Sequence, residues 1–335
     1  MKLPIISEVS IIQPQHQFKY SVLYQNEKIF RYRYDYDTKL LQDFIRERYF
    51  KNEDSEQLEK VLSTRVQLNG ESVDRQTMLQ QGDWIEYLHL RSDEDQLDLD
   101  LPILFEDDWL LAISKPDFLP VIPNTSFYFN SLAIMIKEKY NNDEISPVHR
   151  LDIETSGVLL FGKNRNACSK VQRLFRLREV EKRYQAVAFE QPTLGSITGN
   201  LVPDRNSKIY TKLMLDTADT NGSQTIIEAC EPWGPYFRIW IKPVSGKTNQ
   251  IRAHLAAINC PIVGDKKYYP DEDVFLDWFE HRNINRLIDR LKLTRQALHC
   301  ESMTFIHPFT EKEIHLQDRT PHWLEKIGVL VEDTI

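Results

Sequence analysis

The sequence predicts an α+β protein in which a mixed β-sheet carries flanking helices and follows a small domain of helices and a hairpin. From about residue 103 onward, short apolar segments typical of strands alternate with helical segments, without the regular βα order of a Rossmann or barrel fold. The phosphate-binding motifs GxGxxG and GxxxxGK(S/T) are absent from the chain. These observations favour α+β over doubly wound and P-loop architectures.

Length and composition are those of a globular protein. The 335 residues leave room for about two domains of roughly 150 residues each. A hydrophobic share of 41% and a charged share of 27% exclude collagen-like, low-complexity and fully disordered chains. No apolar run approaches the roughly 18 residues of a membrane span, and the start lacks a signal-peptide pattern. We therefore expect no membrane partner and a cytoplasmic location, or else a nuclear or organellar one.

Residues 1–90 are expected to form the small domain. Apolar residues recur at helical spacing over 37–49 and again over 55–62, which predicts two short helices. Asn69-Gly70 then supplies the two positive-φ residues that a tight hairpin turn needs, and residues 84–90 are predicted as a strand. Two helices followed by a hairpin make a compact module.

An acidic linker at 91–102 is predicted to lead into a larger domain over 103–335, which places the boundary near residue 100. Short apolar segments of this domain are predicted as strands, at 109–113, 156–161, 184–189, 225–229, 237–241 and 303–306. Segments with helical spacing of apolar residues are predicted as helices, at 131–140, 166–180, 249–258 and 284–291.

Charge is distributed unevenly along this acidic chain of net charge −8. Residues 1–100 carry 13 basic and 19 acidic side chains, net −6, whereas residues 151–255 carry 15 and 10, net +5. The basic side chains cluster at Lys163, Arg165, Lys170, Arg173, Arg176, Arg178, Lys182 and Arg183. Such a cluster fits phosphate binding, although taken alone it is more often a solvated helix face.

The four cysteines are expected to be buried thiols. Cys168, Cys230, Cys260 and Cys300 lie 62, 30 and 40 residues apart and form no CxxC pair. This spacing does not favour a zinc site or a disulfide framework, so no metal is expected.

The most informative segment is HRLDIETSG at 149–157, which leads directly into a predicted strand. Its carboxylate, Asp152, is flanked by Arg150 and by hydroxyl and glycine residues suited to tight turns. A carboxylate held in this way suits a nucleophile or a base. From the residues alone, however, a turn-capping aspartate is the more frequent alternative.

The segment HRLDxxTSG followed by a strand resembles the signature of the RluA family of pseudouridine synthases at every fixed position. The resemblance continues in chain order over about 103–310. Its other motifs are ILFEDDWLLAISKPDFLPVIP, EKRYQAVA, SGKTNQIRAHL, GDKKYYP and QALHCESMTFIHP. The chain departs from the family pattern at Ser114, Ser245, Lys247 and Asn249, none of which is central to the chemistry. The resemblance implies a largely antiparallel sheet of the pseudouridine synthase type.

The resemblance also implies isomerisation of a uridine in ribosomal or transfer RNA, without a cofactor. Asp152 matches the essential carboxylate, which attacks the ribose anomeric carbon or assists formation of a glycal, and the sequence leaves both routes open. Arg252 matches the arginine that pairs with it and favours its ionised form. Tyr184 matches the tyrosine that packs against the uracil and is placed to take part in removing the C5 proton. Arg150 matches the residue that enters the stack when the target nucleotide is extruded.

RNA contacts are expected from Lys182, which shares a strand face with Tyr184, and from Lys163, Arg173 and Arg176 of the basic cluster. The first domain resembles a small RNA-binding domain first described in a ribosomal small-subunit protein. Its second helix is acidic, so a degenerate or protein-facing module is an equal alternative.

Three other features are given no catalytic role. His149 and His254 are expected to make structural hydrogen bonds, because no partner lies at ligand spacing. Glu154 is interpreted as a bystander, since paired glycosidase carboxyls flank a bound sugar from opposite sides. The helical insert at 270–295 is longer than the family usually has, which leaves substrate choice and a packing role open.

Two rival functions remain: a non-catalytic RNA-binding or chaperone protein on the same fold, and a hydrolase of nucleoside N-glycosidic bonds. A monomer is the default expectation.

Overall fold

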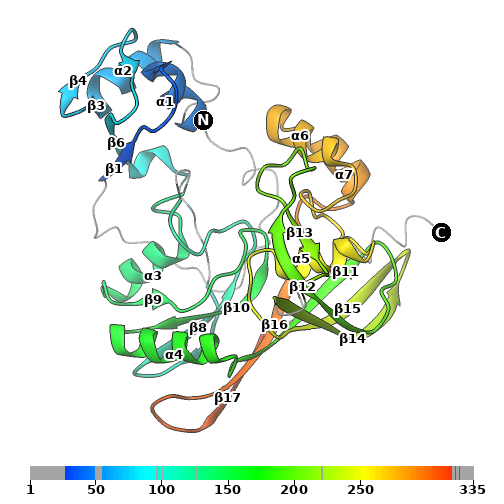
Figure 1. Ribbon diagram of the computed structural model, residues 1–335. Coiled ribbons are helices and arrows are strands. Elements are labelled where there is room, and N and C mark those ends of the chain that lie inside the picture. The colour runs from blue at the N-terminus through cyan, green and yellow to red at the C-terminus, as the bar shows by residue number, and fades with distance from the viewer. Residues whose placement is uncertain are drawn as a thin grey trace. The chain divides into compact units, whose positions relative to one another are not determined.

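The computed structural model describes residues 27–49, 55–95, 97, 99, 101–124, 127–219, 222–318, 321 and 324 (Figure 1). These residues fall into two compact units. The first lies within Met1–Asp100 and Ile122–Asp143, and the second within Leu101–Val121 and Glu144–Ile335. The boundary predicted near residue 100 remains a prediction, because the chain passes between the units more than once.

The first unit contains the predicted helices, α1 (Leu41–Tyr49) and α2 (Ser55–Arg65). Its four-stranded sheet follows the order β1 (Glu27–Arg33), β6 (Trp84–Leu90), β3 (Val66–Leu68) and β4 (Glu71–Ser72). A two-stranded pair joins β2 (Lys39–Leu40) to β5 (Met78–Leu79). Asn69 and Gly70 have φ of 53° and 87° between β3 and β4, which confirms the predicted hairpin.

A later segment completes this unit. Glu94 follows the short helix η1 (Arg91–Asp93), and its carboxylate accepts hydrogen bonds from the backbone N–H groups of Tyr128, Phe129 and Asn130 at 2.7–3.0 Å. Helix α3 (Leu132–Tyr140) follows, with its apolar face buried. The predicted helix at 131–140 is therefore confirmed.

The second unit is built on one long sheet (Figure 1). Its order is β13 (Leu213–Asp216), β12 (Gly195–Pro203), β14 (Ser223–Trp233), β15 (Tyr236–Pro243), β11 (Glu181–Ala188), β16 (Leu298–Ile306), β10 (Ser156–Gly162), β8 (Leu110–Lys115) and β7 (Ile103–Glu106). Strand β17 (Glu313–Gln317) pairs with β16, and β9 (Ser146–Pro147) pairs with β10. Among the described strands every pairing is antiparallel except that of β10 with β16, which confirms the mixed, largely antiparallel sheet.

The helices of this unit are α4 (Arg165–Leu177), α5 (Gln250–Ala257), α6 (Glu272–His281) and α7 (Ile284–Leu291). Helix α5 contributes Ile251 and Leu255 to the core that underlies the centre of the sheet. Helices α6 and α7 occupy the predicted insert and pack on each other through Val274, Leu287 and Leu291. The helices predicted at 166–180, 249–258 and 284–291 are therefore confirmed.

One glycine fixes how β10 meets β16. Gly157 has φ of +114°, and a Cβ added there would lie 2.2 Å from the carbonyl oxygen of Cys300. Any other residue would force the two strands apart. The TSG end of the sequence motif is thus a requirement of the close parallel pairing.

The cysteines differ from expectation in part. Cys260 and Cys300 are buried, whereas Cys168 and Cys230 are only partly buried, and all four are free thiols. Cys168 lies on α4 and Cys230 in the bulged half of β14, where one side of the element faces solvent. No helix among the described residues is long and apolar enough to cross a membrane.

Candidate active site

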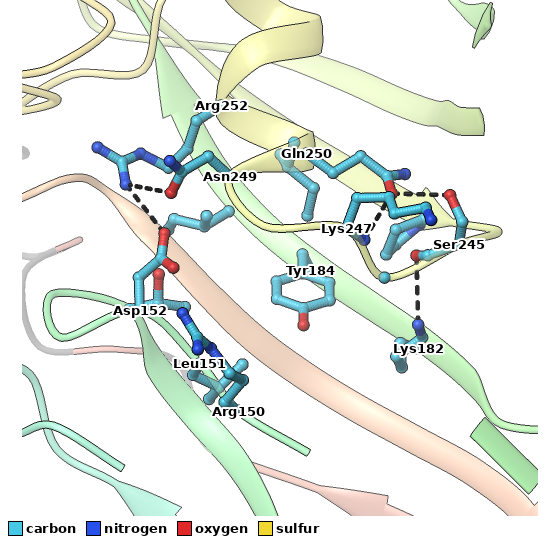
Figure 2. Close-up of a pocket in the computed structure, with 15 residues that line it drawn as sticks. Arg150, Leu151, Asp152, Lys182, Tyr184, Ser245, Lys247, Asn249, Gln250 and Arg252 are labelled. Carbon is cyan, nitrogen blue, oxygen red and sulfur yellow. Dashed lines mark hydrogen bonds and ion pairs between the residues drawn. The ribbon is translucent and has the colours of Figure 1, made fainter. Parts of the chain in front are cut away.

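A cleft of about 100 Å³ opens above the centre of the second unit's sheet (Figure 2). It brings together three segments that are far apart in the sequence: the 150–155 loop before β10, the start of β11, and the 243–252 turn into α5. Asp152, Tyr184, Arg252, Arg150 and Lys182 all line it, so the predicted catalytic residues share one cavity with two of the predicted RNA contacts.

The loop that carries Asp152 is held from below. Lys115 is fully buried, and its ammonium donates hydrogen bonds to the carbonyls of Ile153 and Thr155 at 3.0 and 2.9 Å. Burial lowers the pKa of Lys115 to about 7. Gln296 adds a hydrogen bond from its side-chain amide to the Thr155 hydroxyl at 2.6 Å. The backbone beside Asp152 is therefore fixed by buried partners.

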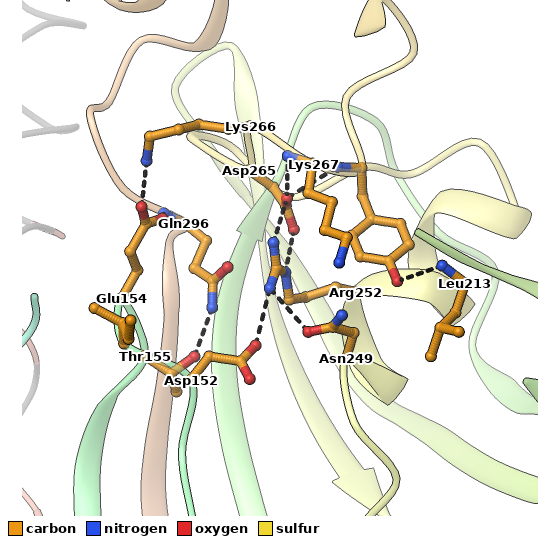
Figure 3. A network of polar contacts seen from close by, with 12 residues as sticks. Asp152, Glu154, Thr155, Leu213, Asn249, Arg252, Asp265, Lys266, Lys267 and Gln296 are labelled. Carbon is orange, nitrogen blue, oxygen red and sulfur yellow. Dashed lines mark hydrogen bonds and ion pairs between the residues drawn. The ribbon is translucent and has the colours of Figure 1, made fainter. Parts of the chain in front are cut away.

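Arg252 joins two carboxylates (Figure 3). Its Nη1 donates to Asp152 Oδ2 at 2.9 Å, while its Nε and Nη2 donate to the two oxygens of Asp265 at 2.7 and 2.8 Å. Asp265 is completely buried, whereas the side chain of Asp152 is 26% exposed. The bidentate pair orients the guanidinium, and its remaining nitrogen faces the more accessible carboxylate.

The charges around Arg252 keep it protonated. Burial alone would lower its pKa, but the charge and hydrogen bonds of Asp265 and the charge of Asp152 more than compensate, so the pKa lies above its ordinary value. Burial likewise works to raise the pKa of Asp265, yet Arg252 and the backbone N–H groups of Tyr268 and Lys267 hold it below its usual range. Asp152 therefore faces a permanent cation.

Two residues that depart from the family motif, Asn249 and Ser245, make hydrogen bonds at the turn before α5. Asn249 begins α5 with φ of 56°, a conformation that asparagine tolerates, and its Oδ1 accepts a bond from Arg252 Nη1 at 3.1 Å. The Ser245 hydroxyl donates to Gln250 Oε1 at 2.7 Å, and the Gln250 amide in turn donates to Thr225 Oγ1 at 3.0 Å. These bonds fix the turn that ends at Arg252.

Tyr184 projects into the middle of the cleft, between the Asp152 and Lys182 sides (Figure 2). Burial and the neighbouring Cys300 thiol raise the pKa of its phenol well above 10. Tyr184 lies opposite Cys300 where β11 shifts register against β16. It therefore presents a neutral aromatic side chain to whatever occupies the cleft.

Lys182 marks the other wall of the cleft. Its ammonium donates to the Ser245 carbonyl at 3.4 Å and lies 6.0 Å from the centre of the Phe175 ring on α4. Burial lowers its pKa. Phe175 in turn stacks on the His149 ring with centroids 4.9 Å apart. The basic helix α4 is thus joined to the cleft by direct contacts.

The remaining predicted RNA contacts lie differently. Arg173 and Arg176 are exposed on α4, and Arg150 is exposed at the cleft. Lys163 instead pairs with Glu106 at 2.7 Å and donates to the Asp107 carbonyl, so part of its charge is neutralised within the fold. The structure therefore presents Arg173 and Arg176 to a ligand more directly than Lys163.

The two histidines make the structural hydrogen bonds that the sequence predicts. His149 Nε2 accepts from the Leu160 backbone N–H at 3.0 Å, and desolvation together with the Lys182 charge lowers its pKa to about 3. His254 is buried and hydrogen-bonded to the Ser223 hydroxyl at 2.9 Å, and burial lowers its pKa to about 4. Both rings are neutral at neutral pH.

Glu154 has a structural partner rather than a place in the cleft. Its carboxylate pairs with Lys266 and accepts the Gln296 backbone N–H at 3.1 Å. Among the described residues, no group of three or more His, Cys, Asp or Glu side chains is arranged to hold a metal ion.

Asp265 is the site residue that sequence reasoning missed. GDKKYYP is one of the motifs that carry the family resemblance, but the residues alone indicate no role for Asp265. Its position in a family motif, directly before two lysines, is the signal that could have identified it. Only the fold shows that this turn lies against α5, 13 residues away, and that its carboxylate holds Arg252.

The sequence is similar to those of known proteins. The family model described as RNA pseudouridylate synthase matches residues 109–257. The dual-specificity RNA pseudouridine synthase RluA of Pasteurella multocida is 31% identical over 216 residues, which cover 63% of this chain and 90% of the relative. The mitochondrial tRNA pseudouridine(32) synthase of Saccharomyces cerevisiae is 28% identical over 241 residues, 70% of this chain and 51% of the relative.

Solved structures agree at the level of the fold. Human RNA Pseudouridylate Synthase Domain Containing 4 superposes with a TM-score of 0.52 at 23% identity, covering 69% of this chain and 93% of that one. Human RNA Pseudouridylate Synthase Domain Containing 1 gives a TM-score of 0.51 at 20% identity, covering 66% and 84%.

Proposed function

The chain belongs to the RluA family of RNA pseudouridine synthases, and from this premise we propose that Asp152 is the carboxylate on which its isomerisation reaction depends. In that reaction the glycosidic bond of a uridine breaks, the uracil turns in place, and its C5 bonds to the ribose. The observation that carries the proposal is the Asp152–Arg252 ion pair at the edge of a cleft that also contains Tyr184.

Arg252 is proposed to hold the Asp152 carboxylate aimed at the ribose. Its Nη1 hydrogen bond of 2.9 Å fixes one carboxylate oxygen for either chemical route, whether Asp152 attacks the anomeric carbon or assists formation of a glycal. Asp265 acts as a positioning residue, because it binds Arg252 at two atoms and does not itself line the cleft. One Asp152 oxygen stays available to the substrate.

Tyr184 is proposed to pack against the uracil ring. Its raised pKa keeps the phenol protonated at neutral pH, which favours packing and hydrogen bonding over direct removal of the C5 proton. The C5 proton must nevertheless leave once C5 is bonded to the ribose. A protonated phenol cannot accept this proton. We infer that Tyr184 assists the step only after its own hydroxyl proton has been transferred to another group.

The proposed substrate is ribosomal or transfer RNA. Relatives of this chain are named as acting on large-subunit ribosomal RNA and on transfer RNA. We propose that Arg173 and Arg176 of α4 contact phosphates beside the cleft, and that Lys182 contacts the bound nucleotide. Arg150, exposed at the cleft, would fill the space left when the target uridine is extruded.

Neither rival function is favoured. A non-catalytic RNA-binding protein would not need the buried Asp265 that orients Arg252 toward Asp152. A nucleoside hydrolase would release free uracil, whereas an isomerase retains the base within the RNA. Analysis of low-molecular-weight products after incubation with RNA and, separately, with free uridine distinguishes these two functions.

The experiment that identifies the substrate is a site-resolved pseudouridine map, by carbodiimide-adduct primer extension, of RNA from cells with and without the gene. We expect one or a few sites to lose the modification, and the wild-type gene but not Asp152→Ala to restore them. Restoration by Asp152→Ala, or free uracil from the purified enzyme, would overturn the proposal.

A further inference from the structure

An exposed tyrosine stands on the loop between β12 and β13. Tyr210 is 96% exposed, although the residue before it, Ile209, is only 4% exposed and anchors the loop in the fold. Single aromatic side chains on a surface are ordinary and need no explanation. What makes Tyr210 informative is how the loop is held and what it adjoins.

The insert helix α6 holds this loop through one carboxylate. Glu272, in the first turn of α6, accepts hydrogen bonds from the Ser207 hydroxyl at 2.7 Å, the Lys208 backbone N–H at 2.8 Å and the Lys212 ammonium at 2.7 Å. The Glu272 and Lys212 side chains are only 16% and 15% exposed, so this is a shielded ion pair. The loop is fixed on both sides of Tyr210.

The same loop adjoins the catalytic pair. The Lys267 ammonium donates to the Thr211 hydroxyl at 2.9 Å. The Tyr268 hydroxyl accepts the Leu213 backbone N–H at 3.3 Å, a bond that Figure 3 shows at Leu213. The Tyr268 ring also lies 5.2 Å from the Arg252 guanidinium, which binds Asp152. A path of contacts through Tyr268 and Arg252 therefore links the residue that follows the loop to the proposed catalytic carboxylate.

From this placement we propose that Tyr210 is a stacking platform for an unpaired base of the substrate RNA next to the target uridine. The inference rests on the proposed function and extends it to a substrate-selecting residue. An exposed aromatic ring on a loop whose backbone is held on both sides is a group on which bases of single-stranded RNA can stack. Extrusion of the target uridine leaves its neighbours unstacked, and such a base is what an aromatic platform binds.

The proposal also assigns a role to the insert at 270–295. Its helices pack on each other and on Tyr269, and they present Glu272 to the loop. The insert thus selects substrate indirectly, by holding Tyr210 in place. Of the two roles left open by the sequence, this favours substrate choice over a packing embellishment.

The first test compares Tyr210→Ala with wild type in a tritium-release assay. RNA labelled with [5-³H]uridine is extracted from cells that lack the gene, so that its target sites are unmodified. Because base stacking on an aromatic ring contributes about 1–3 kcal/mol, kcat/KM should fall about 5- to 150-fold, mainly through KM. Tyr210→Phe keeps the ring and should restore most of this loss.

The matched control is Leu194→Ala. Leu194 is 57% exposed and precedes β12, at the opposite end of the strand from the loop. Its truncation removes exposed apolar surface without touching the loop, so kcat/KM should stay at the wild-type value. An equal loss in Leu194→Ala and Tyr210→Ala would overturn the proposal.

The second test examines the support from α6. Glu272→Ala should lower kcat/KM in the wild-type background but cause little further loss in the Tyr210→Ala background, because both act through one ring. Additive losses in this cycle would show that Glu272 does not act through Tyr210. Thermal melts of all variants show whether the fold persists.

A binding measurement separates failure of this inference from failure of the proposed function. Affinity for the same RNA is compared between Asp152→Asn and the Asp152→Asn/Tyr210→Ala double variant. Weaker binding by the double variant supports the platform. If wild-type protein releases no tritium, that result overturns the proposed function but not the platform. Equal affinities overturn the platform.

Discussion

Replacement of Asp265 by asparagine tests how the site is held together. Oδ2 of Asp265 accepts the Arg252 Nε–H at 2.7 Å, while Oδ1 accepts Arg252 Nη2 and the backbone N–H groups of Lys267 and Tyr268 at 2.8–3.0 Å. In Asp265→Asn one of these oxygens becomes an NH₂ group. If the remaining oxygen accepts the three hydrogen bonds now made to Oδ1, the new NH₂ group faces the Arg252 Nε–H. Two donors then oppose each other.

The expected cost is that of breaking a buried ion pair. Asp265 is 0% exposed, and removal of one partner from a buried pair costs about 3–5 kcal/mol. For a unit of this size each kcal/mol lowers the melting temperature by about 2–4 °C, so Asp265→Asn should melt about 6–20 °C lower. Activity should fall as well, because Arg252 loses the contact that aims it at Asp152.

The assay is a thermal melt combined with tritium release below the melting transition. Asp35→Asn is the matched control, since it makes the same chemical change in a surface pair with Arg33 whose side chains are both 61% exposed. An ion pair exposed in this way contributes little to stability, so the control should melt close to wild type. If Asp265→Asn melts and turns over like the control, Asp265 does not position Arg252.

Three further predictions concern the fold and the RNA-binding face. Gly157→Ala should fail to give soluble folded protein, because its Cβ would meet Cys300 backbone atoms at 2.2–2.7 Å. A soluble variant with the melting temperature of wild type would contradict this. Arg173→Ala and Arg176→Ala should each reduce the slope of log affinity against log salt by about 0.7–0.9, and slopes equal to wild type would remove α4 from the interface. His149 has a pKa of about 3 in the fold, below its unfolded value of about 6.5, so its stability contribution is complete above pH 6.5 and is lost as the pH falls toward 3. Urea unfolding at pH 7 and 5 should show a loss of about 2 kcal/mol that His149→Gln lacks, and an equal loss in that variant would refute the assignment.

Elements set by local chemistry could be predicted from the sequence. The Asn69-Gly70 hairpin follows from the positive φ that those two residues tolerate, and α7 follows from the spacing of its apolar residues. The resemblance to a family motif pointed to the loop around Asp152, and the structure places that loop at the cleft. Of the four other predicted site residues that line the cleft, Lys182, Tyr184 and Arg252 come from other contiguous motifs, and Arg150 belongs to the same motif as Asp152.

What the sequence did not show depends on contacts between distant segments. The parallel pairing of Ser156 with His299 joins strands that are separated by most of the unit, and no local pattern specifies it. Strand β12 was missed because Gly195 and Gly199 weaken its strand signal, although its pairing with β14 supplies the order that local propensity lacks. The role of Asp265 likewise exists only once its turn lies against α5.

The most direct test of the central claim is tritium release by purified wild-type and Asp152→Asn protein, with RNA binding measured on both. Asp152→Asn keeps the size and shape of the side chain that accepts the Arg252 hydrogen bond but removes the charge that bond breaking requires. We predict that the variant binds RNA within a fewfold of wild type and releases no tritium above background. Turnover by Asp152→Asn at a substantial fraction of the wild-type rate would show that the reaction does not depend on this carboxylate.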